Sequence, residues 1–141
     1  MSNLHLLSNH LPIIGTFLGI VLLIIALLKP NLKTALSAYL ILIISGVGGL
    51  IAYLSGESAE HQLEKVKGIS HQVIHIHEQF AEKTLFFIFL LAALSLVGFW
   101  AERVEWFGAR KLQIGALIVG IVVFILFVFT GYLGGQISHG G

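Results

Sequence analysis

The chain has 141 residues, a length that fits a single domain. Hydrophobic residues make up 57% of it and charged residues only 11%, whereas a soluble domain averages roughly 45–50% apolar and about 25% charged residues. So few charges cannot cover a water-facing surface, which excludes a soluble enzyme. The net charge of +1 gives no indication of nucleic-acid binding. Because the chain has no cysteine, disulfides, thiolate metal sites and covalent attachment of a c-type haem are excluded.

Four uncharged apolar runs divide the chain, at residues 11–28, 35–54, 85–101 and 112–133. A bilayer core of ~30 Å needs roughly 17–25 helical residues, so each run is long enough to cross it. Uninterrupted apolar runs also exclude the alternating pattern of a membrane barrel. We therefore predict an all-α integral membrane four-helix bundle with up-down-up-down topology. Residues 1–10 contain no Lys or Arg, so the first run is interpreted as a mature span with Pro12 at an early helical position, not as a signal peptide.

Small residues recur at four-residue spacing within three of the runs, in Gly15-x-x-x-Gly19, Ser45-x-x-x-Gly49 and Ala116-x-x-x-Gly120. This spacing places small side chains on one helix face, so that two backbones can approach closely. We expect helix packing at Gly15, Gly19, Gly49 and Gly120.

The segment between the second and third runs, residues 55–84, is predicted to be an amphipathic helical hairpin. Gly68 breaks the pattern, and Ser70 is a plausible N-cap for a helix that continues into the third run. At about 100° per residue, one stripe of this helix carries metal-ligand residue types. Its members are His71, His75, Glu78 and Glu82. We favour a solvated face, because apolar residues occupy the opposite side, and both glutamates suit the positive N-terminal end of the helix.

His77 lies about 120° away from that stripe, at the edge of the apolar face. A histidine directed toward a bundle core needs a partner, since burying an unpaired polar group costs a few kcal/mol. That partner is a hydrogen bond, a metal ion or a haem iron, and the sequence leaves all three open.

Charge predicts the orientation. The loops after the first and third runs contain five Lys and Arg against two Glu, and the opposite side contains three Lys against five Glu. By the positive-inside rule, both termini and the 55–84 segment face outward. In a bacterial inner membrane they would face the periplasm.

The histidines are confined to that predicted outer side, where the starts of the first and third spans meet the ends of the second and fourth. The residues expected there are His5, His10, Glu57, His77, Tyr132 and His139. Imidazole with carboxylate is a ligand set for Zn, Cu or non-haem Fe, and two imidazoles on facing helices can hold a haem iron. Alternatively, the histidines simply titrate at the interface near pH ~6.5.

Several motifs together resemble one family. They are His10-Leu11-Pro12-Ile13, Gly56-Glu57, His77, and Thr130-Gly131-Tyr132-Leu133-Gly134-Gly135 followed by His139. This combination is similar to a widespread family of bacterial four-span membrane proteins of unknown function, although Leu6 stands where the family has proline. The resemblance implies that His5, His10, His77 and His139 belong to the site. Some relatives are joined to c-type cytochrome domains, which implies electron transfer or haem association.

The leading hypothesis is a metal centre, haem b or non-haem Zn, Cu or Fe, near the outer surface, serving electron transfer or metal handling. Its ligands would be His10 and His77, completed by His139, His5 and Glu57, with Tyr132 and Glu78 as further polar residues. The expected partners are the lipid bilayer, a periplasmic or membrane redox protein and a second copy of the chain. The rival hypothesis is a structural or assembly subunit without cofactor, in which the histidines form a hydrogen-bond network.

Overall fold

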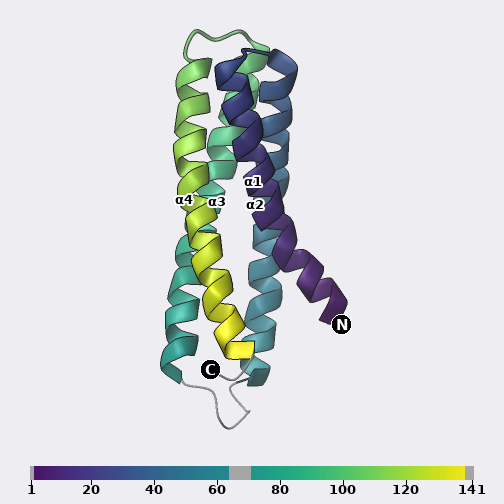
Figure 1. Ribbon diagram of the computed structural model, residues 1–141, viewed down its shortest axis with the longest axis vertical. Coiled ribbons are helices and arrows are strands. Elements are labelled where there is room, and N and C mark those ends of the chain that lie inside the picture. The colour runs from purple at the N-terminus through teal and green to yellow at the C-terminus, as the bar shows by residue number, and fades with distance from the viewer. Residues whose placement is uncertain (1, 64–70, 139–141) are drawn as a thin grey trace.

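The computed structural model describes the backbone of residues 2–63 and 71–138, and the side chains of residues 10–55, 72 and 74–135. The described chain forms four helices, α1 (Ser2–Leu28), α2 (Leu32–Leu63), α3 (His71–Arg103) and α4 (Ala109–Ser138). Each helix packs against the next, and α1 also packs against α4. The predicted all-α four-helix bundle with up-down-up-down topology is confirmed (Figure 1).

The two ends of the bundle differ. One end carries the two short connections, residues 29–31 and 104–108, and is called the short-connection end. The other end carries both termini and is called the terminal end (Figure 1). Because α2 reaches Leu63 and α3 begins at His71, the predicted helical hairpin between the second and third spans is confirmed. Gly68 and Ser70, the predicted break and N-cap, lie outside the described residues.

All four helices are long and apolar enough to cross a membrane, over His10–Leu28, Leu32–Ser55, Ile74–Arg103 and Ala109–Gly135. Large apolar side chains cover the outside of the bundle, with Phe86, Ile44 and Val128 among those exposed. Such a surface is stable in lipid but not in water, because exposing each apolar side chain to water costs the free energy of its transfer from an apolar medium. The chain is an integral membrane protein.

The expected position of Pro12 is wrong. Helix α1 begins at Ser2, so Pro12 lies inside the helix and not near its start. Proline has no N–H to donate to the carbonyl of Ser8, and its ring crowds that carbonyl, which bends a helix. The first turns of α1 lean away from the other three helices (Figure 1). The ring of Pro12 is itself buried and faces Gly48 of α2, where a Cβ would lie 3.6 Å from the proline Cδ.

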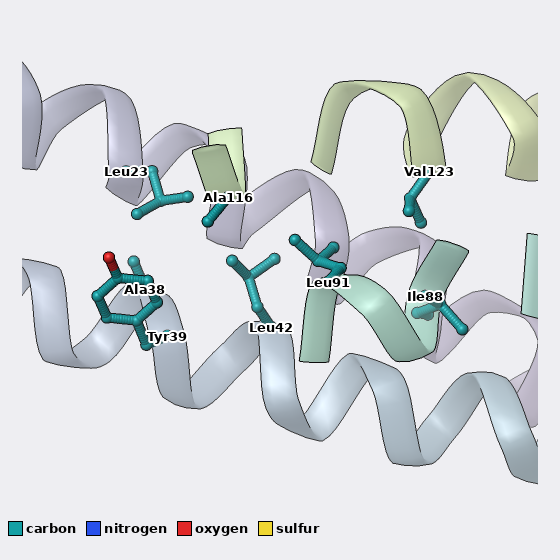
Figure 2. Packing of buried hydrophobic residues seen from close by; sticks show 8 residues of the cluster. All are labelled: Leu23, Ala38, Tyr39, Leu42, Ile88, Leu91, Ala116 and Val123. Carbon is teal, nitrogen blue, oxygen red and sulfur yellow. The ribbon is translucent and has the colours of Figure 1, made fainter. Parts of the chain in front are cut away.

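One apolar cluster fills the centre of the bundle and draws on all four helices (Figure 2). Its members are Leu23, Ala38, Tyr39, Leu42, Ile88, Leu91, Ala116 and Val123. Lipid tails are as apolar as leucine, so this core is held by close van der Waals packing and not by exclusion from water.

The glycines singled out by their spacing face neighbouring helices. Gly15 and Gly19 of α1 point at α2, and Gly120 of α4 points at α1. Gly49 of α2 points at α3, where an added Cβ would lie 2.8 Å from Cδ1 of Ile88. Side chains at these positions would push the helices apart, so the absence of a Cβ sets how closely the helices approach.

Candidate functional site

His77 occupies the seam between α3 and α4 at the terminal end. It is half-buried, and its imidazole donates a hydrogen bond to the backbone carbonyl of Thr130. The ring lies against Gly134, where an added Cβ would be 3.3 Å from Cε1 of His77. Thr130 and Gly134 are one turn apart on α4, so a single face of the carboxy-terminal motif receives the histidine. The lack of a side chain at Gly134 makes room for the ring.

A pair of threonines continues the seam toward the centre of the membrane. The hydroxyl oxygens of Thr84 and Thr130 are 3.1 Å apart, and Thr84 is buried. Each hydroxyl also lies within hydrogen-bond distance of a carbonyl in its own helix, Phe80 for Thr84 at 2.7 Å and Leu126 for Thr130 at 2.8 Å. A hydroxyl has one proton to donate. The threonine that donates across the seam therefore releases its own helix carbonyl.

Aromatic rings flank the same seam. Phe80 of α3 and Phe129 of α4 stack with centroids 6.2 Å apart and an interplanar angle of 18°. The ammonium of Lys83 lies 5.5 Å from the centroid of Phe80, which is within the range of a cation–π interaction. The stacked phenylalanines join α3 to α4, whereas the contact of Lys83 with Phe80 lies within α3.

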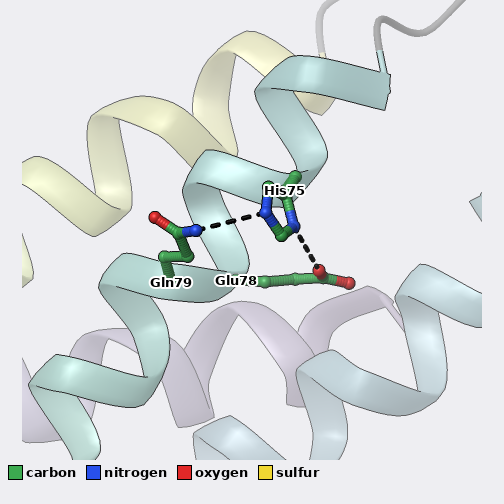
Figure 3. Close-up of polar contacts among 3 residues, drawn as sticks. All are labelled: His75, Glu78 and Gln79. Carbon is green, nitrogen blue, oxygen red and sulfur yellow. Dashed lines mark hydrogen bonds and ion pairs between the residues drawn. The ribbon is translucent and has the colours of Figure 1, made fainter.

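Two members of the predicted polar stripe on α3, His75 and Glu78, contact each other, and His75 also contacts Gln79 (Figure 3). Nδ1 of His75 is 3.8 Å from Oε2 of Glu78, and the amide of Gln79 donates to Nε2 of His75 at 3.1 Å. The His75 side chain is 70% exposed, and Glu82 is also exposed. These exposed positions support the interpretation of the stripe as a solvated face. The carboxylate of Glu78 faces His75. The side chain of His71 lies outside those described.

The structure describes the other candidate ligands only in part. His10 is exposed on α1. His5 and Glu57 lie in α1 and α2 near the terminal end, but their side chains are outside those described, and His139 is outside the described residues altogether. Tyr132 is exposed on α4.

The described residues contain no group of three or more His, Asp or Glu positioned to hold a metal ion. Helices α1 and α3 occupy opposite corners of the bundle, since each packs against α2 and α4. The contacts described for the ring of His77 lie on α4, not on α1. The structure therefore brings His77 together with Thr130 and Gly134, and it does not place the described part of α1 against it.

A second polar cluster lies near the short-connection end and was not predicted. The amide of Gln113, on α4, donates to the carboxylate of Glu102, on α3, and only 8% of Gln113 is exposed. Tyr39 of α2 is fully buried beside Gly98, one turn before Glu102, and its hydroxyl has no hydrogen-bond partner among the described residues. From the sequence, Glu102 counted only toward the charge of its loop. The signal that could have indicated this cluster was Gln113, because it is an isolated amide in an apolar run.

The chain was compared with protein-family models, with curated proteins and with solved structures. None of the three comparisons gives a match. The family resemblance carried by the terminal motifs therefore stays an expectation. The functional argument rests on the residues of the chain itself.

Proposed function

We propose that this integral membrane protein holds a metal centre at the terminal end of the bundle, with His77 as the anchored ligand, for electron transfer or metal handling. The observation that supports the proposal is the fixed imidazole, half-buried on Gly134 and bonded to the carbonyl of Thr130. A histidine that binds a metal typically donates its other N–H to a carbonyl or carboxylate, which sets its orientation and its tautomer. The hydrogen bond from His77 to the carbonyl of Thr130 would orient the imidazole in this way, and Nδ1 of the ring is buried in the bundle.

One imidazole does not complete a site. The remaining ligands are assigned to His10, His5, Glu57 and His139, which belong to α1, α2 and the end of the chain after α4. Two imidazoles suit haem b, whereas imidazoles with the carboxylate of Glu57 suit Zn, Cu or non-haem Fe. A bound haem, Cu or Fe would supply one-electron transfer, and a bound Zn would indicate metal handling.

The test is an absorbance spectrum and a metal analysis of protein expressed in metal-replete, haem-supplemented cells and purified in detergent. A Soret band or a stoichiometric metal is expected in the wild type and lost in His77→Ala. His75→Ala is the matched control, since this neighbouring histidine is exposed, and it should retain the metal. A colourless, metal-free wild-type protein contradicts the proposal.

The second candidate function is a structural or assembly subunit without cofactor. It is favoured by the use of His77 as a link between α3 and α4, and by the exposure of His10. The same samples separate the two functions. A subunit of this kind would be metal-free, and His77→Ala would lower its thermal stability, while His77→Gln would recover part of it by donating to Thr130.

We further propose that the short-connection end faces the cytoplasm of a bacterial cell and that both termini face the periplasm, where a redox partner would meet the metal centre. The support is the excess of Lys and Arg at the short connections. Because the chain has no cysteine, single cysteines report topology directly. Gln72→Cys should react with an impermeant thiol reagent in intact cells, and Phe107→Cys only after lysis. The reverse result inverts the topology.

A further inference from the structure

Unpaired positive charge gathers at the short-connection end. Its charged residues are Lys29, Lys33, Arg103, Arg110 and Lys111, against Glu102 and Glu105. Five positive and two negative charges give this end a net charge of +3. All five cations are exposed, and among the described residues none lies within ion-pair distance of a carboxylate. The carboxylate of Glu102 accepts the amide of Gln113 and lies beyond ion-pair distance of all five cations.

Contacts between the helix ends bring part of this charge together. The guanidinium of Arg110, in the first turn of α4, donates to the carbonyl of Leu27 at the end of α1, 3.3 Å away. Lys29 follows two residues after Leu27, and Lys33 lies in the first turn of α2 across the same connection. Asn31 holds that connection by accepting the N–H of Thr34 on its side chain at 3.1 Å. Lys29, Lys33, Arg110 and Lys111 are called the basic cluster.

Aromatic side chains lie at the same level of the bundle. Phe107 is 89% exposed, and Trp100 and Trp106 are also exposed. Trp100 lies in the last turn of α3. The turn that presents Trp106 and Phe107 is fixed by Glu105, which has a φ of 52°, and by the N–H of Trp106, which donates to the carbonyl of Ala101 at 2.9 Å. Exposed tryptophans at the end of a membrane span mark the depth of the lipid headgroups. The basic cluster therefore lies where lipid phosphates lie.

We propose that the basic cluster binds the headgroup of an anionic phospholipid in the adjoining leaflet. Arginine and lysine at this depth attract anionic headgroups, and basic surfaces between the ends of membrane helices are a known type of lipid site. The neighbouring Leu28 is 77% exposed and would meet the acyl chains of the same lipid. The charge of the cluster favours this occupant over a zwitterionic lipid, whose headgroup carries no net charge. This inference does not depend on the metal centre.

The proposal is tested on the purified full-length protein by thermal unfolding in detergent, with phosphatidylglycerol or phosphatidylcholine added. Phosphatidylglycerol should raise the melting temperature saturably, and phosphatidylcholine should raise it less. The triple variant Lys29→Gln/Lys33→Gln/Lys111→Gln should lose most of the phosphatidylglycerol effect. The side chains of these lysines make no described ion pair or hydrogen bond, so the variant is expected to fold, and circular dichroism checks its helix content.

Lys83→Gln is the matched control, because Lys83 is an exposed lysine nearer the terminal end of the bundle, and it should keep the full response. Inorganic phosphate at the same concentration should have no effect, which separates a lipid site from a site for free phosphate. If the two lipids stabilise the wild-type protein equally, the proposal is wrong, whatever the variants show. A triple variant that keeps the wild-type response overturns the assignment to the basic cluster.

Discussion

Gly98 of α3 offers a direct test of how this bundle is packed. A Cβ placed there would lie 2.5 Å from Cε1 of Tyr39 and 2.6 Å from its hydroxyl oxygen. The tyrosine ring is rigid and fully buried within the central cluster, so it cannot swing into open space. Gly98→Ala must therefore displace the ring or move α2 away from α3.

The magnitude follows from two opposing effects. Replacing glycine by alanine within a helix stabilises it by about 1 kcal/mol, whereas forcing one extra methyl group into a close-packed core costs about 1–3 kcal/mol. Gly115→Ala on α4 isolates the first effect, since nothing lies within 4 Å of its added Cβ. The propensity gain cancels between the two variants. Gly98→Ala should therefore be less stable than Gly115→Ala by about 1–3 kcal/mol.

The assay is equilibrium unfolding in mixed micelles with increasing SDS, followed by circular dichroism. A second variant confirms the cause: in a Tyr39→Leu background the ring is gone, so Gly98→Ala should cost less than it does in the wild type. Equal stability of the Gly98→Ala and Gly115→Ala proteins would refute the described approach of α2 to α3.

Three further outcomes are expected in the same unfolding assay. Tyr39→Phe should raise the free energy of unfolding by about 1–3 kcal/mol, because it removes a buried hydroxyl that has no hydrogen-bond partner among the described residues; a loss of stability would indicate that this hydroxyl is hydrogen-bonded in the membrane. Gln113→Leu should lower it by about 1.5–3 kcal/mol, since the carboxylate of Glu102 loses its donor, and no change would mean that water replaces the amide. Thr84→Val and Thr130→Val should each lower it by about 0.5–1.5 kcal/mol, and the double variant should lose less than the sum; strict additivity would show that the two hydroxyls do not interact.

The position of His77 was only partly predictable. Its angle around the helix indicated the edge of the apolar face and a need for a partner, and the structure gives it a half-buried position with Thr130 as a partner. The angle could not name that partner, because it does not say which helix lies opposite. His10 was expected beside His77 from topology alone, but α1 and α3 lie at opposite corners and the first turns of α1 lean outward.

The second polar cluster escaped prediction for a related reason. Glu102 and Gln113 are separated by a turn whose backbone is set by Glu105 in a left-handed conformation. Left-handed backbone at a glutamate has no sequence signature comparable to glycine or asparagine. Without that turn, the register of α3 against α4 and the pairing of Glu102 with Gln113 cannot be derived.

The sequence by itself determined that this chain is a helical membrane protein with four spans, because a backbone in lipid must satisfy its own hydrogen bonds and each apolar run is long enough to cross. It also determined that the histidines lie toward one end of the bundle. Only the tertiary structure decided how each helix is rotated and which side chains meet across the seams. The reason is that lipid and core are equally apolar, so hydrophobic patterning does not orient a membrane helix. Close contacts at Gly98 and Gly134, with Tyr39 and His77 against them, carry that information instead.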